Sequence, residues 1–172
     1  REMAASGKPM PPLSDVGFQV YSQTDEDGIL LYIFSVIAAG YRKCLEICAG
    51  NGIVCNTANL IINHGWTGLL IDGNELLVEA GRRFYERLRP TCVYPPKFLC
   101  RWITRDNINQ ILVENDFQGE IGLLSLDVDG MEYWFWEALQ VATRFQLTLG
   151  LSIPKPPTFS RPGALSARTM LF

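Results

Sequence analysis

Two closely spaced glycines follow an apolar run in the first third of the chain. The run is Lys43-Cys44-Leu45-Glu46-Ile47-Cys48-Ala49-Gly50-Asn51-Gly52. Because glycine has no Cβ, its backbone N–H can come close to a ligand. A helix is expected to begin at once, near Ile53, and its N-terminus would favour an anionic group at the loop. The acid Glu46 instead suits a cationic or hydroxyl-bearing ligand.

Polar side chains recur where later apolar runs end. They are Asp72, Thr104, Asp106, Asp127 and Asp129. The carboxyl ends of parallel strands meet at one edge of a sheet, so these side chains are expected to share a site. Asp72 stands about 20 residues after Gly50, a spacing at which an acid can accept hydrogen bonds from both hydroxyls of a ribose.

Strand and helix patterns alternate along the chain. Apolar periodicity predicts strands at 43–48, 66–72, 97–104, 122–128 and 145–151, and helices at 25–39, 53–64, 75–88, 106–116 and 131–141. Alternation with short connections predicts an α/β fold, a parallel sheet with helices on both faces. At the start of the helix at 106–116, Asp106 is expected to accept hydrogen bonds from free N–H groups of the first turn.

The chain is expected to hold one domain between two irregular ends. Residues 1–17 predict a flexible N-terminal arm, residues 18–150 the folded domain, and residues 151–172 an irregular Pro-rich tail. No Asp or Glu occurs from Ala138 to Phe172, whereas four prolines do. We therefore expect the fold to be incomplete at its C-terminal end, and a shifted reading frame or a truncation is our hypothesis for the tail.

Composition narrows the classes of partner. The 172 residues are 48% apolar and 19% charged, enough for one domain with a core. The net charge of −3 gives no reason to expect nucleic acid as a partner, and no apolar stretch approaches the roughly 18 residues of a membrane span. The five cysteines lack zinc-site spacing, which predicts buried, reduced thiols in a cytoplasmic protein.

Three motifs resemble a known enzyme family. The Glu46-x-Cys48-x-Gly50-x-Gly52 pattern is similar to the E-x-G-x-G-x-G motif of S-adenosylmethionine-dependent methyltransferases, with Cys48 in place of the first glycine. The runs Ser22-Gln23-Thr24-Asp25-Glu26-Asp27-Gly28 and Leu124-Ser125-Leu126-Asp127-Val128-Asp129-Gly130-Met131-Glu132 resemble the S-Q-x-x-E-D and L-K-I-D-V-E-G-x-E signatures of FkbM-type methyltransferases. The resemblance covers about residues 21–139. Ser125 stands where the family often has Lys, and Asp129 is shorter than the family's Glu.

The resemblance implies a Rossmann-like methyltransferase fold and S-adenosyl-L-methionine as cofactor. The residues that would bind it are Gln23, Asp27, Glu46, Ala49, Gly50, Asn51, Gly52, Asp72, Asn74, Thr104, Asp106 and Asp127. By this resemblance Asp72 would bind the ribose and Asp106 the adenine amino group. Asp127 would lie near the sulfonium, where it or Asp129 would be the catalytic base for the methyl acceptor. Gln23 or Asp27 would close the pocket.

Several alternatives stay open. The expected reaction is O-methylation of a small-molecule or sugar-like acceptor, but the chain could also bind the cofactor and transfer nothing. A nicotinamide-dependent oxidoreductase is a further alternative, disfavoured because Cys55 replaces the third glycine of G-x-G-x-x-G. Asp127 and Asp129 alternate on an extended segment and point to opposite faces. Together they could hold a divalent cation, yet we assign no metal, and the sequence does not indicate an oligomeric state.

Overall fold

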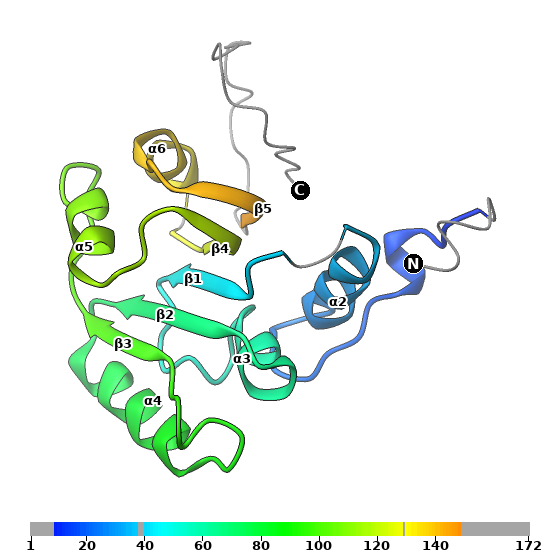
Figure 1. Cartoon of the computed structure of the whole chain (residues 1–172), viewed down its shortest axis with the longest axis horizontal. Coiled ribbons are helices and arrows are strands. Elements are labelled where there is room, and N and C mark those ends of the chain that lie inside the picture. Colours follow the sequence, from blue (N-terminus) through cyan, green and yellow to red (C-terminus); the bar gives the residue numbers. More distant parts are fainter. Residues whose placement is uncertain (1–8, 38–39, 129, 149–172) are drawn as a thin grey trace.

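Five parallel strands form one sheet in the computed structural model, which describes residues 9–37, 40–128 and 130–148. The strands are β1 (Lys43–Ile47), β2 (Thr67–Asp72), β3 (Lys97–Cys100), β4 (Glu120–Leu126) and β5 (Ala142–Thr148). Their order is β3-β2-β1-β4-β5 (Figure 1). β2 and β3 therefore lie on one side of β1, and β4 and β5 lie on the other. A ligand site is expected where the order switches, between β1 and β4.

Helices cover both faces of this sheet, as the sequence predicts. They are α2 (Glu26–Ile37), α3 (Ala58–His64), α4 (Glu75–Arg87), α5 (Ile108–Glu114) and α6 (Glu132–Ala138), and a short 3₁₀ helix, η1 (Leu13–Asp15), precedes them. Along β1, side chains alternate between two apolar clusters: Cys44 belongs to the cluster with α2, α3 and α4, and Leu45 to the cluster with α5 and α6. The α/β fold with a parallel sheet is thus confirmed.

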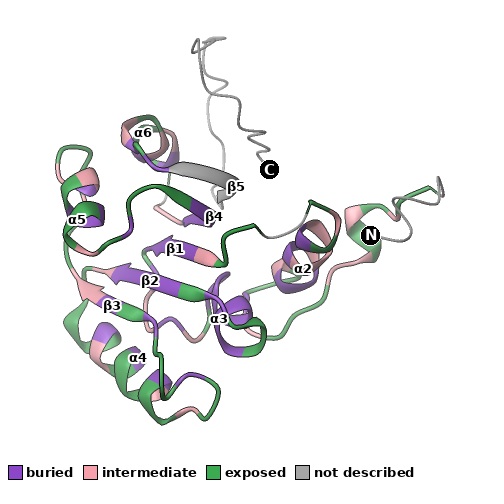
Figure 2. Ribbon diagram, in the orientation of Figure 1, coloured by how far each residue is buried: buried purple, intermediate pink, exposed green. Residues whose placement is uncertain are grey.

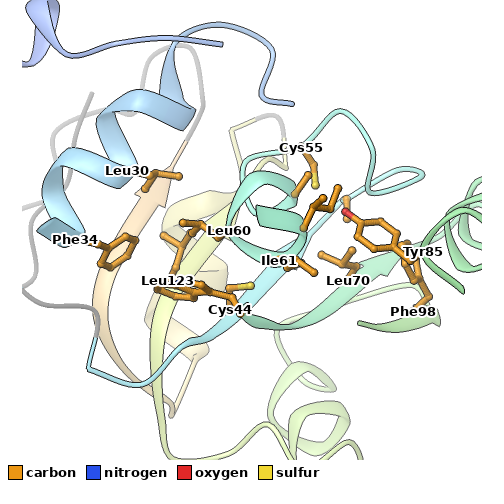
Figure 3. Packing of buried hydrophobic residues seen from close by; sticks show 14 of the residues in the cluster. Leu30, Phe34, Cys44, Cys55, Leu60, Ile61, Leu70, Tyr85, Phe98 and Leu123 are labelled. Carbon is orange, nitrogen blue, oxygen red and sulfur yellow. The ribbon is translucent and has the colours of Figure 1, made fainter. Parts of the chain in front are cut away.

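The central strands are buried on both faces, as Figure 2 shows for β1, β2 and β4. Such burial is typical of parallel sheets between two helix layers. Figure 3 shows one buried cluster, which includes Phe34 of α2 and Tyr85 of α4. The ring centroids of Phe34 and Trp66 lie 4.7 Å apart, and those of Tyr85 and Phe98 lie 5.5 Å apart. These contacts fix α2 and α4 relative to the sheet.

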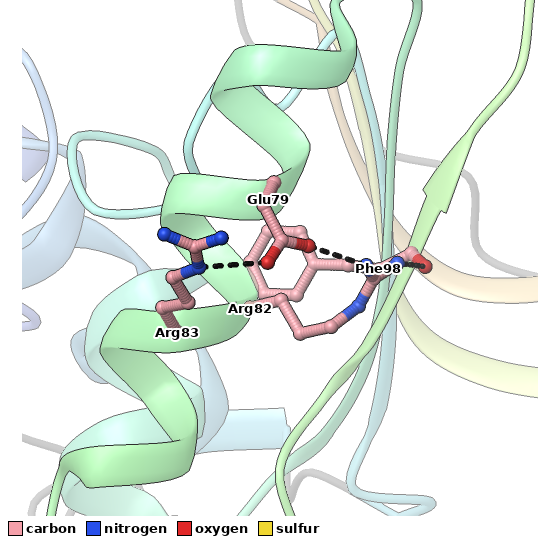
Figure 4. Close-up of polar contacts among 4 residues, drawn as sticks. All are labelled: Glu79, Arg82, Arg83 and Phe98. Atoms are coloured by element: carbon pink, nitrogen blue, oxygen red, sulfur yellow. Dashed lines mark hydrogen bonds and ion pairs between the residues drawn. The ribbon is translucent and has the colours of Figure 1, made fainter.

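Charged side chains tie α4 to the edge strand β3 (Figure 4). Arg82 Nη2 donates to the carbonyl oxygen of Phe98 at 3.2 Å, and Arg82 and Arg83 both pair with Glu79, at 2.8 and 2.7 Å. The hydrogen bond from Arg83 is the main cause that lowers the pKa of the Glu79 carboxyl. These two arginines therefore lie on the solvated face of α4, where both bind Glu79 and Arg82 also binds the backbone of β3.

Several element boundaries differ from the sequence-based predictions. The last strand, predicted at 145–151, is β5 at 142–148. The helix predicted from Ile53 begins at Ala58, and the strand predicted to reach Thr104 ends at Cys100. The helix predicted from Asp106 begins at Ile108. Its N-cap residue is Asn107, whose side-chain oxygen accepts the N–H of Thr104 at 2.8 Å. The prediction that Asp106 caps this helix is therefore wrong.

Part of the predicted N-terminal arm packs against the domain. Within residues 9–17, η1 forms a turn, and the carbonyl of Pro11 accepts the hydroxyl of Tyr32 at 3.1 Å. Residues 1–8 of the arm, Asp129 and the tail predicted at 151–172 lie outside the described residues. Among the helices that the structure describes, none has the length and apolar character needed to cross a membrane.

Candidate functional site

A pocket of about 160 Å³ lies at the carboxyl ends of β1 and β4, where the strand order switches. Six of the predicted cofactor-binding residues line it: Gln23, Glu46, Ala49, Gly50, Asn51 and Asp127. Four residues without a predicted role line it as well: Cys48, Val54, Cys55 and Asn56. The fold thus brings the ends of two strands, the segment before α2 and the loop before α3 to one place.

Glu46 lies at the base of this pocket and is only 3% exposed. Its Oε1 accepts the N–H of Asn56 at 3.1 Å, and its Oε2 accepts the N–H of Thr57 at 2.9 Å. The hydroxyls of Thr57 and Ser125 also donate to it, at 2.6 and 3.2 Å. Four donors therefore satisfy the buried carboxylate, which holds the two residues that precede α3 against the sheet.

Three N–H groups of the loop after β1 donate to acceptors within the protein, so they are not available to an anion. The N–H of Ala49 donates to Ile71 O, that of Gly50 to Asp72 Oδ2, and that of Gly52 to Ala49 O. The loop continues to Thr57 before α3 begins. The expectation of an anion site at a helix N-terminus directly after the glycines is therefore wrong.

The two glycines serve different purposes. Both have positive φ, +57° at Gly50 and +66° at Gly52, which favours glycine. A Cβ on Gly50 would meet nothing within 4 Å, whereas one on Gly52 would lie 2.8 Å from side-chain atoms of Leu70 and Phe98. The hydroxyl of Tyr85 also donates to Gly52 O at 2.5 Å. Gly52 thus serves core packing and does not line the pocket.

Asp72 links the loop after β1 to the start of α4. Its Oδ2 accepts the N–H of Gly50 and its Oδ1 accepts the N–H of Asn74, both at 2.8 Å. Asn74 in turn caps α4, since its Oδ1 accepts the N–H groups of Leu76 and Leu77. Asp72 is half-buried beside the pocket, and each of its oxygens retains a lone pair for a further donor.

The remaining predicted residues lie away from the pocket. Thr104 and Asp106 are exposed beyond the end of β3 and are not among the lining residues. Asp27 is buried and accepts hydrogen bonds from its own segment. Of the two predicted catalytic acids, Asp127 lines the pocket, whereas Asp129 lies outside the described residues.

Trp102, which the sequence reasoning missed, is 80% exposed beyond β3. Its indole lies over Gly73, where a Cβ would come within 3.0 Å of the ring carbon Cε3. The ring therefore lies beside the residue that follows Asp72, whose carboxylate binds the N–H of Gly50. No signal in the sequence identified it, because Trp102 falls inside the strand predicted at 97–104, which in the structure ends at Cys100.

The lining residues carry two carboxyl groups and no basic side chain. Burial, followed by the negative charge of Glu46, raises the pKa of the Cys44 and Cys55 thiols well above the usual value. All five cysteines are free, but only these two are buried, so the prediction of buried thiols holds for them and is wrong for the exposed Cys48 and Cys92. Electrostatically, the pocket suits a cationic or neutral ligand.

Cys48 adopts a left-handed conformation, with φ of +64°. A non-glycine residue in this region costs about 1 kcal/mol or more, and Cys48→Gly relieves that cost at an exposed position. We expect Cys48→Gly to raise the free energy of unfolding by about 0.5–1 kcal/mol, measured by urea denaturation, despite the greater freedom of glycine in the unfolded chain. The control Cys48→Ser removes the thiol but retains Cβ, so an equal gain there would contradict the explanation.

Comparisons with protein-family models, with curated proteins and with solved structures gave no match to this chain.

Proposed function

We propose that this protein is a methyltransferase that binds S-adenosyl-L-methionine and methylates a hydroxyl of a small-molecule or sugar-like acceptor. The observation that carries the proposal is the pocket at the β1–β4 switch point, with Glu46 and Asp127 in its lining and no basic side chain. A sulfonium cofactor carries positive charge at its reactive centre, and such a pocket favours that charge. The three sequence motifs contribute Gln23, Glu46, Gly50 and Asp127 to the same pocket.

The pocket disfavours the alternative of a nicotinamide dinucleotide. A pyrophosphate is usually bound by free N–H groups of a glycine loop at a helix N-terminus. Here the N–H groups of Ala49, Gly50 and Gly52 donate to the protein, and that of Ile53 donates to Asn51 Oδ1 at 3.0 Å. The two carboxyl groups would also repel the phosphates.

The proposed cofactor fits the pocket together with the adjoining surface. A volume of about 160 Å³ is below the range of about 300–1,000 Å³ that encloses ligands of this size. We therefore place only the part around the sulfur inside it. The ribose hydroxyls would donate to Asp72, and the purine would stack on the exposed side of Trp102, whose indole covers Gly73. In this arrangement Asp106 and Thr104 contribute less than the family resemblance implies.

The chemistry asked of the protein is positioning and proton transfer. When bound, S-adenosylmethionine supplies an electrophilic methyl group. The carboxylate of Asp127 would take the proton of the acceptor hydroxyl as its oxygen receives the methyl group, and S-adenosylhomocysteine would be the leaving group. Asp127 is suited to this role because it follows β4 directly and lines the pocket.

Calorimetry with S-adenosylhomocysteine and S-adenosylmethionine tests the binding step, with NADH as the comparison ligand. We expect both adenosyl ligands to bind and NADH not to bind. A methyl-release assay with a panel of hydroxylated acceptors then tests transfer. Binding without turnover would favour a module that holds the cofactor and transfers nothing, and binding of NADH alone would overturn the proposal in favour of an oxidoreductase.

The Asp127→Asn variant tests whether the positive charge of the sulfonium contributes to binding, apart from the rest of the ligand. The substitution removes a negative charge beside the pocket while retaining the size of the side chain. We expect affinity for S-adenosylmethionine to fall about three- to tenfold, and affinity for the neutral thioether S-adenosylhomocysteine to change less, because only the former has a positive sulfur. The matched control is Asp116→Asn, an exposed acid before β4 at the opposite edge of the sheet. Equal losses for both ligands in Asp127→Asn would contradict the assignment.

A further inference from the structure

We propose that Asp27 is a positioning residue that acts on the pocket through Gln23, by holding residues 18–23 as a preformed wall. This inference rests on the proposed function for its ligand, and it replaces the direct cofactor contact that the sequence resemblance implies for Asp27. Gln23 lines the pocket, whereas Asp27 does not.

Asp27 holds the wall by accepting a run of backbone donors. Its side chain is 1% exposed, and Oδ2 accepts the N–H groups of Val20, Tyr21 and Ser22 at 2.7, 2.6 and 2.8 Å. The Ser22 hydroxyl donates to the same oxygen at 3.0 Å. Three successive N–H groups that converge in this way form a nest suited to an anion, and here the anion comes from the chain itself.

A second side chain fixes the far end of the wall. Gln19 Nε2 donates to the carbonyl oxygens of Ser22 and Gln23, at 3.0 and 2.9 Å. The N–H of Ser22 and the carbonyls before and after the Cα of Gln23 are therefore held by side chains. The direction in which Gln23 leaves the backbone follows from these contacts.

Close packing joins the wall to α2. The N–H of Gly28 donates to Phe18 O at 3.0 Å, and a Cβ on Gly28 would collide with Val16 O and Phe18 N. Gly28 is thus the residue that lets the chain before the wall lie against the first turn of α2. Asp27 and Gly28 are neighbours in that turn. Gly28 leaves the space in which the preceding chain packs, and Asp27 accepts the N–H groups of the wall.

Among residues 18–23, Gln23 is the one that lines the pocket. Asp27 Oδ1 has no hydrogen-bond partner among the described residues, and Oδ2 is already bound by four donors. Replacing Asp27 with Asn leaves one oxygen for the nest but removes the charge, and hydrogen bonds to charged groups are the stronger ones. The wall should then loosen without loss of the whole helix.

The test is a double-mutant cycle between Asp27→Asn and Gln23→Ala, read by affinity for S-adenosylhomocysteine. We expect each single variant to weaken binding about three- to tenfold, and Asp27→Asn to add little in the Gln23→Ala background. A residue that merely stabilised the fold would weaken binding equally in both backgrounds, so additive losses would overturn the proposal. Asp15→Asn, an exposed acid of η1, is the control and should leave affinity unchanged.

Hydrogen exchange keeps this inference separate from the proposed function. We expect the amides of Val20, Tyr21 and Ser22 to lose protection in Asp27→Asn, while those of β1 and β2 keep theirs. Unchanged protection at these three amides would overturn the proposal whether or not the cofactor binds. If the wild-type protein binds no adenosyl ligand while the amides lose protection as expected, the proposed function fails and the structural role of Asp27 stands.

Discussion

Replacing Glu46 with alanine is expected to lower the free energy of unfolding by about 3 kcal/mol and to abolish binding of the adenosyl cofactor. The substitution leaves the N–H groups of Asn56 and Thr57 without their acceptor in a buried place. It also removes the acceptor of the Ser125 hydroxyl on β4, which then keeps only its hydrogen bond from Asn56 Nδ2. The start of α3 then loses its attachment to β1, and the pocket loses its base. Chemical denaturation and calorimetry measure the two effects.

Two further variants make this expectation specific. Glu46→Gln retains the volume but turns an amide donor toward groups that donate, so we expect an intermediate loss of about 1–2 kcal/mol. Glu120→Ala removes an exposed glutamate from the start of β4 and should change stability by less than about 0.5 kcal/mol. A Glu46→Ala protein as stable as the wild type would show that the hydrogen bonds to Asn56, Thr57 and Ser125 do not hold α3.

Replacing Asp72 with alanine is expected to weaken cofactor binding about 100-fold while lowering stability by only about 1 kcal/mol. Two hydroxyl donors of the ribose would lose a charged acceptor, which accounts for the larger effect. The N–H groups of Gly50 and Asn74 also lose their partner, but this place is half-buried and water can replace it. Calorimetry and urea denaturation separate the two quantities.

The comparison variant is Asp106→Ala, at the other residue to which the sequence assigns an adenosyl contact. Because Asp106 is exposed and does not line the pocket, we expect its affinity to stay within about threefold of the wild type. A large loss at Asp106 with little loss at Asp72 would contradict the placement of the ribose and the purine given above.

The sheet and most helices could be predicted because their signals are local. β1 and β2 are short apolar runs, and in α4 the apolar residues recur at helical spacing, so each element is marked within its own residues. The start of α3 could not be predicted in this way. The side chain that holds it, Glu46, lies 11 residues before Thr57 and reaches it only once β1 is in the sheet.

The roles of individual site residues also could not be predicted where they depend on contacts with other elements. Asp106 has the residue type of a helix cap, yet Asn107 takes the cap position, and the two differ by one residue on an exposed turn. Gly52 has the residue type of a ligand-contacting glycine, yet Leu70 and Phe98 occupy the space beside it. Type and spacing cannot distinguish these outcomes, because they depend on neighbours from other elements.

The sequence by itself determined the α/β class, the parallel sheet and the residues around Glu46, Gly50 and Asp127 that meet at one pocket. It could do so because strand periodicity and the common edge of parallel strands follow from backbone geometry. Only the tertiary structure decided what each side chain does there. It directed the loop N–H groups to protein acceptors and buried Asp27 beneath Gln23's segment. Those choices depend on contacts between residues far apart in the chain, which packing alone brings together.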